Sequence, residues 1–195
     1  MLKTGNKAPD FELQDDQDET FRLRNHAGKW LLLVFYPGDD TPVGTRQLCE
    51  YRDGIEEFEG LGVEVVGISG DDAESHRKFK QKRSLPFRLL SDPDLSVAEK
   101  FGCRGLMGMK RGVFLLDAEQ ICRYAHVESV ALFRRSREEL VEQIVNIIQE
   151  NIDPEGWRAL GGETGVITTE NYLGQTVLSA YAPIQAGGQR WALLA

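Results

Sequence analysis

An uninterrupted apolar run constrains the fold of this chain more than any other feature of its sequence. The run, WLLLVFY, extends from Trp30 to Tyr36 and ends at Pro37-Gly38. A run without polar alternation indicates a strand that is buried on both faces, as in the centre of a sheet covered by helices. A second run of this kind, VEVVGI, extends from Val63 to Ile68. Together the two runs predict an α/β fold.

Helical patterns and shorter strands surround the two runs. Apolar residues at three- and four-residue steps predict one helix from the loop after Gly38 to about Leu61. A capping box of Ser136 and Glu139 opens a last helix, which ends near residue 152. The other expected elements are a hairpin at 11–13 and 21–23, a helix at 72–85, a strand at 87–90, a helix at 94–101, and a hairpin at 113–116 and 122–127. They give an α/β domain with a mixed central sheet and helices on both faces.

The composition changes after this domain. The sequence Asp153-Pro154-Glu155-Gly156 is a boundary signal, so we expect two domains, at 1–152 and 153–195. The second is a short β-rich C-terminal extension, with strands expected at 166–172, 176–183 and 190–194. Its aromatic residues Tyr172, Tyr181 and Trp191 favour oligomerisation if exposed, and a homodimer is one expected assembly.

Composition argues against several functional classes. The formal net charge is -8, so the chain should repel nucleic acid and anionic membrane surfaces. No stretch approaches the roughly 18 apolar residues of a membrane span. The N-terminus lacks the apolar region of a secretion signal, and we expect a cytoplasmic protein. Neither a metal nor a cofactor is expected, because no ligand spacing is found among Cys49, Cys103, Cys122, His26, His76 and His126.

The segment Phe35–Asp53, FYPGDDTPVGTRQLCEYRD, is the strongest candidate for a functional site. It joins the end of the first buried strand to the start of a helix, and ligand sites in open α/β sheets favour the carboxyl ends of strands. A helix N-terminus presents unpaired N–H groups and a partial positive charge. A cysteine at such a place has a lowered pKa and reacts as the thiolate.

This segment resembles the active-site stretch of the peroxiredoxins, close to the bacterioferritin-comigratory type of the alkyl hydroperoxide reductase–thiol-specific antioxidant superfamily. The family pattern F-Y-P-x-D-x-T-P-x-C-T-x-x-x-C is matched at Phe35, Tyr36, Pro37, Asp39, Thr41, Pro42, Thr45 and Cys49. With its flanking matches, the resemblance covers roughly residues 2–150. It implies a thioredoxin-like fold and an antioxidant thiol peroxidase that reduces hydrogen peroxide and organic hydroperoxides with a thioredoxin-like reductant.

The resemblance also implies roles for individual residues. The counterpart of Pro37 shields the reactive sulfur from water, and the counterpart of Thr41 holds the peroxide through its hydroxyl. Arg111 is expected to support the thiolate and the charge that moves across the breaking O–O bond. Each residue also has a plainer interpretation, in which Pro37 ends the strand, Thr41 caps the helix, and Arg111 is an ordinary strand-edge residue.

The family position of the peroxide-attacking cysteine is occupied by Gly44. A glycine carries no nucleophile, so we expect peroxidase activity to be lost and the chain to be a pseudoenzyme. Cys49 stands at the resolving-cysteine position. On a helix it lies about 7.5 Å further along the axis than Gly44 and about 140° around it, facing away from Thr41. An inert Cys49 is therefore favoured over a surrogate nucleophile, and Cys103 and Cys122 are interpreted as core or surface residues.

The tail resembles the closing strands of Cache-type sensor modules, which occur outside the membrane in bacterial receptors and cyclases. The matching pieces are 162–165, 172–174, 177–184 and 191–194. The alternatives are a β-rich extension that packs on the first domain or pairs with another chain, and a fragment of a longer product. This resemblance supplies a second functional hypothesis, a non-catalytic interaction or sensor domain in a signalling protein.

Overall fold

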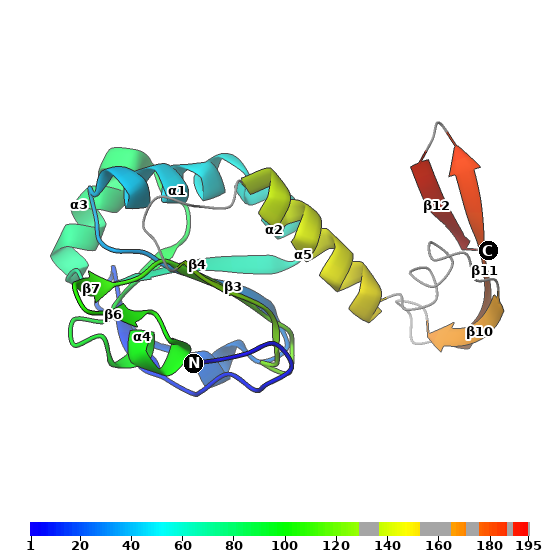
Figure 1. Ribbon diagram of the computed structural model, residues 1–195, viewed down its shortest axis with the longest axis horizontal. Coiled ribbons are helices and arrows are strands. Elements are labelled where there is room, and N and C mark those ends of the chain that lie inside the picture. Colours follow the sequence, from blue (N-terminus) through cyan, green and yellow to red (C-terminus); the bar gives the residue numbers. More distant parts are fainter. Residues whose placement is uncertain (129–136, 153–164, 171–175, 187–188, 195) are drawn as a thin grey trace. The chain divides into compact units, whose positions relative to one another are not determined.

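The chain divides into two compact units, Met1–Val141 and Glu142–Ala195 (Figure 1). The computed structural model describes residues 1–128, 137–152, 165–170, 176–186 and 189–194. None of the helices in these ranges combines the length and hydrophobicity needed to span a bilayer.

A seven-stranded mixed sheet forms the centre of the first unit, in the order β2-β1-β5-β4-β3-β8-β9. The central strand β3 pairs in parallel with β4 and antiparallel with β8. The strands of the sheet are β1 (Glu12–Asp15), β2 (Thr20–Arg22), β3 (Trp30–Phe35), β4 (Val63–Ser69), β5 (Arg88–Ser91), β8 (Gly112–Leu116) and β9 (Cys122–Val127). The two apolar runs are therefore neighbouring interior strands, as the sequence predicts.

Helices cover both faces of this sheet. Figure 1 shows α1 (Pro42–Asp53) and α3 (Ala73–Arg83) on one face and α4 (Ser96–Phe101) on the other. The remaining helices are the 3-10 turn η1 (Leu23–His26), α2 (Ile55–Gly60) and α5 (Arg137–Ile152). The α/β class and the mixed, doubly covered sheet are confirmed.

Aromatic side chains join the sheet to α4. Phe101 of α4 lies with its ring centroid 5.2 Å from that of Phe35 and 5.1 Å from that of Phe114. All three side chains are fully buried. Because each aromatic side chain removes a large apolar area from water, this cluster is a main stabilising contact of the face opposite α1.

Two local predictions are corrected. The single helix expected up to Leu61 is two helices, α1 and α2, because the chain leaves helical geometry at Gly54, with φ -109° and ψ 14°. A short hairpin of β6 (Arg104–Gly105) and β7 (Gly108–Met109) was not predicted, since two-residue strands carry no periodicity. The capping residue Ser136 lies outside the described residues.

The second unit contains a three-stranded antiparallel sheet in the order β10-β11-β12. Its strands are β10 (Gly165–Glu170), β11 (Thr176–Ala186) and β12 (Gln189–Leu194). The three strands expected in the tail are thus confirmed, except that the predicted end of the first, at 171–172, lies outside the described residues.

Candidate active site

The loop between β3 and α1 lies at the carboxyl end of the two central parallel strands. Tyr36 N donates a hydrogen bond to Ile68 O at 3.0 Å, which holds the chain beside β4 for one residue beyond β3. The chain then turns through Asp40, which has a left-handed φ of 53°, and enters α1 at Thr41. Candidate site residues therefore lie where ligand sites of α/β sheets are commonly found.

Thr41 is the N-cap of α1. Its Oγ1 accepts a hydrogen bond from Gly44 N at 3.2 Å and donates one to Gly38 O at 2.8 Å. The capping interpretation of this residue is confirmed. Its hydroxyl hydrogen is directed to the backbone of the preceding loop.

Gly44 is buried in the first turn of α1, and its neighbours approach it closely. A Cβ atom at this position would lie 2.7 Å from Thr41 Oγ1, 3.0 Å from Gly38 O and 3.3 Å from Tyr36 Cδ2. The first distance is shorter than van der Waals contact allows. A side chain at residue 44 therefore requires Thr41 or the loop at Gly38 to move.

Arg111 lies in a row of residues that crosses three strands. The register pairs Phe35 with Gly112 and Gly112 with Val127, so one residue further Tyr36, Arg111 and Glu128 are neighbours. Glu128 N donates to Arg111 O at 3.0 Å, which shows that the pairing of β8 and β9 continues to this point. Cross-strand neighbours project their side chains from the same face of a sheet.

Arg111 and Glu128 form a buried ion pair between Nη2 and Oε2. Their side chains are only 2% and 8% exposed. Both residues line a pocket of about 500 Å³ together with Pro37. The interpretation of Arg111 as an ordinary strand-edge residue does not describe this buried, paired position.

The β6–β7 hairpin forms the other wall of this pocket. Leu106 and Met107, at its tip, are fully exposed, and Met109 is buried beneath them. The pocket therefore combines apolar walls with a charged pair, a composition common in small-molecule sites.

The structure brings the predicted residues into two groups that Tyr36 connects. Thr41 and Gly44 touch at the start of α1, whereas Pro37 and Arg111 line the pocket. Tyr36 is the register neighbour of Arg111, and its ring contacts the position of a Cβ at Gly44. Pro37 is exposed and follows the end of β3.

The cysteines lie apart from these groups. Gly44, Gln47, Leu48 and Tyr51 form the buried face of α1, and Cys49 is only partly buried on another side. Cys103 and Cys122 are core residues, as one of their two interpretations predicts. Burial raises the pKa of the Cys103 thiol to about 12 and that of the Cys122 thiol to about 11.

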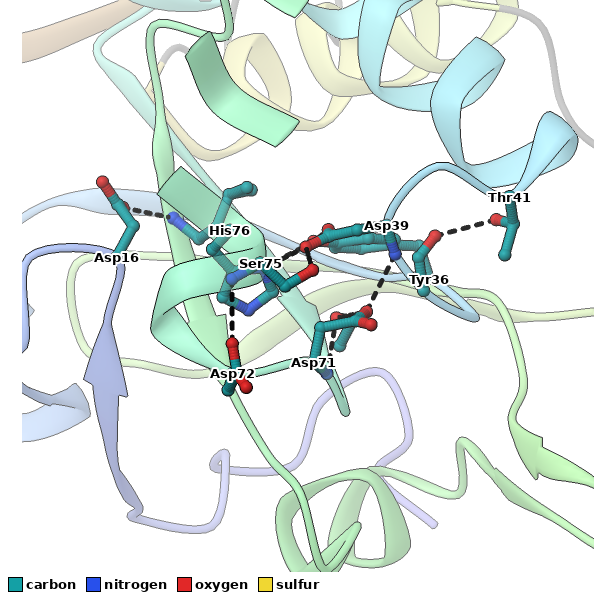
Figure 2. A network of polar contacts seen from close by, with 11 residues as sticks. Asp16, Tyr36, Asp39, Thr41, Asp71, Asp72, Ser75 and His76 are labelled. Atoms are coloured by element: carbon teal, nitrogen blue, oxygen red, sulfur yellow. Dashed lines mark hydrogen bonds and ion pairs between the residues drawn. The ribbon is translucent and has the colours of Figure 1, made fainter. Parts of the chain in front are cut away.

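A network of polar side chains holds the loop between β3 and α1 in place. Figure 2 shows Asp39 between Tyr36, which follows β3, and the α3 residues Ser75 and His76. Asp39 Oδ1 accepts from Tyr36 Oη at 2.8 Å, and Oδ2 accepts from Ser75 Oγ at 2.8 Å and lies 2.9 Å from His76 Nδ1. Asp39 N donates to Asp71 Oδ2 at 2.8 Å. The loop that leads into α1 is thereby tied to the start of α3.

The same network holds Tyr36 in its neutral form. Burial, followed by the nearby Asp39 carboxylate, raises the pKa of the Tyr36 phenol well above its usual value. The phenol therefore remains a hydrogen-bond donor to Asp39 over the physiological pH range.

Sequence reasoning missed His76, Ser75 and Glu128. A signal for His76 was present, because it precedes the buried Phe79 by three residues and so shares its helix face. Glu128 directly follows β9, and only the register of β8 and β9 brings it to Arg111.

Comparisons with known proteins point to one group. A family model described as the AhpC/TSA family matches residues 4–125. The chain is similar to peroxiredoxin Bcp of Bacillus subtilis (strain 168), with 42% identity over 126 residues that cover 60% of this chain and 80% of the relative. It is 41% identical over 128 residues to the chloroplastic peroxiredoxin Q of Oryza sativa subsp. japonica, covering 64% of this chain but only 59% of that protein.

A solved structure resembles the fold. The crystal structure of peroxidoxin BcpB from Mycobacterium tuberculosis superposes with a TM-score of 0.67 at 30% identity, covering 76% of this chain and 97% of that one. This likeness confirms the expected thioredoxin-like fold. The match of the family model ends at residue 125 and does not include the tail at 153–195.

Proposed function

Because the chain belongs to the AhpC/TSA family of peroxiredoxins, we propose that it keeps the fold and pocket of a thiol peroxidase but does not reduce peroxides through a thiolate at the start of α1. The enzymes of this lineage are expected to reduce hydrogen peroxide and organic hydroperoxides with a thioredoxin-like reductant. In this chain Gly44 occupies the position that the family pattern assigns to the peroxide-attacking cysteine.

The packing around Gly44 is the observation that carries the proposal. A Cβ at residue 44 would lie 2.7 Å from Thr41 Oγ1 and 3.0 Å from Gly38 O, so the neighbouring atoms leave little room for a side chain. The hydroxyl of Thr41, which the resemblance assigns to the peroxide, donates instead to Gly38 O. Residue 44 therefore carries no thiol, and its close neighbours leave little room for one.

The three cysteines are poor substitutes for the missing thiol. Cys103 and Cys122 are fully buried, and their raised pKa values keep them protonated at neutral pH. Cys49 is the eighth residue of α1, five residues after Gly44, and lies on a side of the helix other than its buried face.

The test is peroxide consumption coupled to thioredoxin, thioredoxin reductase and NADPH. We expect the wild-type protein to show no turnover above a Cys49→Ser variant with either hydrogen peroxide or an organic hydroperoxide. Rapid wild-type turnover that Cys49→Ser abolishes would show that Cys49 is the nucleophile and that the proposal is wrong.

The exposed hairpin tip favours a second candidate, a non-catalytic interaction domain. Leu106 and Met107 are fully exposed apolar side chains beside a pocket, and such patches commonly mark binding surfaces. Light scattering of the wild type and of Leu106→Ser/Met107→Ser tests the simplest case, a homodimer through this surface. A wild-type dimer that the variant loses supports this candidate, whereas two monomers contradict that case.

A further inference from the structure

We propose that Glu128 is the built-in counter-anion of Arg111 and that it determines which ligands the pocket accepts, excluding carboxylates and admitting neutral molecules. The inference deepens the proposed function and rests on it only for the identity of the pocket. No comparison or motif assigns a role to Glu128.

The backbone register, rather than a chance side-chain orientation, places Glu128 at Arg111. The two residues extend the antiparallel pairing of β8 and β9 by one position, and their main chains are joined by the hydrogen bond from Glu128 N to Arg111 O. Directly opposite residues have Cβ atoms about 5 Å apart on one face. Opposite charges at directly facing positions attract each other, so this register favours the ion pair of Arg111 and Glu128.

Burial makes this pairing necessary. Arg111 is always charged and its side chain is 2% exposed, so it requires an anion beside it. The start of α1 offers none, because residue 44 is a glycine. Asp39, in the loop after β3, and Asp71, in the loop after β4, are partly buried acids that accept hydrogen bonds from Tyr36, Ser75 and Ser69. Glu128 supplies a carboxylate to the guanidinium, with which it forms a buried ion pair.

The ion pair lines the pocket, and its two charges offset each other. A carboxylate that entered beside Pro37 would approach Arg111 only by competing with the carboxylate of Glu128. Lys110 also lines the pocket, but it is exposed, so its charge is screened by solvent. The fixed features that a ligand meets are a neutral pair and apolar walls from Met107 and Met109.

Removing the Glu128 side chain should reverse this selectivity. Glu128→Ala removes the carboxylate of this ion pair and leaves a space of carboxylate size beside the buried guanidinium of Arg111. Acetate carries the deleted group and is the probe. We expect about 0.2 M sodium acetate, compared with equal sodium chloride, to raise the melting temperature of Glu128→Ala by about 2–4 °C through binding to the folded state. The wild type should show no such rise.

Three controls separate this effect from general stabilisation. Acetamide, which is neutral and of similar shape, should not stabilise Glu128→Ala. The double variant Arg111→Ala/Glu128→Ala should not respond to acetate, because the cation is gone. Glu99→Ala removes the partner of exposed Arg104 and should also not respond.

Each outcome bears on the inference. If Glu128→Ala is unfolded in chloride, circular dichroism should show that acetate restores its secondary structure. The inference is wrong if acetate neither stabilises nor refolds this variant, if the wild type responds equally, or if the double variant keeps the response. No peroxide is present, so these results are independent of peroxidase activity.

Discussion

A glycine at residue 44 influences both the chemistry and the packing of the site. The fixed spacing of Thr41, Pro42 and Thr45 allows the sequence to identify residue 44 as the position without a thiol. The close approach of Thr41 Oγ1 and Gly38 O could not be predicted, because it depends on a side-chain rotamer and on the path of a loop. The sequence alone shows that residue 44 has no side chain, but only the structure shows how closely its neighbours approach it.

Gly44→Ala tests whether that space is filled. In an unobstructed helix, alanine is about 1 kcal/mol more favourable than glycine. Here we expect the variant to lose about 1–3 kcal/mol of unfolding free energy, because its Cβ must displace Thr41 or the loop at Gly38. Urea unfolding measures the change.

Gly60→Ala is the matched control for this measurement. Gly60 ends α2, and a Cβ added there meets nothing within 4 Å. We expect its stability to be unchanged or to rise by up to about 1 kcal/mol. Equal gains for Gly44→Ala and Gly60→Ala would show that residue 44 has room for a side chain.

At the scale of elements, α3 holds the loop that leads into α1. Its first turn contacts Asp39 through Ser75 and His76, and Lys82 in its last turn pairs with Asp40 at 2.8 Å. The sequence predicts α3 and the strands before and after it, β4 and β5. The contacts to the loop join residues more than 30 positions apart, and no local pattern could indicate them.

Asp16 makes a comparable link between the β1–β2 hairpin and the rest of the sheet. Its carboxylate accepts from Leu89 N at 3.0 Å and from Lys80 Nζ at 2.9 Å. Burial alone would raise the pKa of Asp16, but the hydrogen bond from Leu89 and the ammonium of Lys80 outweigh it, so the pKa lies below its ordinary value of 3.8.

The lowered pKa predicts an acid-dependent loss of stability. The stabilisation is fully present above the unfolded pKa near 3.8 and disappears as the pH falls through the lower folded pKa. Asp16→Asn should therefore cost about 1–3 kcal/mol at pH 7 and progressively less below about pH 4. Urea unfolding across this pH range measures both curves. A pH-independent difference, or an equal effect of Asp18→Asn at an exposed pair, would contradict the assignment.

At the scale of the whole molecule, sequence and structure both indicate two parts. The sequence predicts a boundary between residues 152 and 153, and the structure divides into compact units between Val141 and Glu142. The two boundaries differ by the length of most of α5. The structural boundary lies inside this helix, whereas the boundary predicted from the sequence lies at its end. We propose that 1–152 is the peroxiredoxin-like domain, because α5 begins within the first unit and its residue Leu140 is buried there.

The isolated fragment 1–152 tests this boundary. We expect it to unfold cooperatively, with a melting temperature within about 4 °C of the main transition of the full chain. A second fragment, 1–136, lacks the buried Leu140 and should be about 1.5–3 kcal/mol less stable, since burying such a side chain contributes about that amount. Calorimetry compares the two. Equal stability of both fragments would place the boundary before α5.

The close packing at the start of α1 also bears on how this lineage can change. A mutation that adds a side chain at residue 44 places its Cβ 2.7 Å from the threonine hydroxyl oxygen and 3.0 Å from a loop carbonyl. The gain of a cysteine at this position therefore favours a particular order of events, in which the loop loosens before the cysteine appears. A reversion in the opposite order passes through a destabilised intermediate, which selection tends to remove.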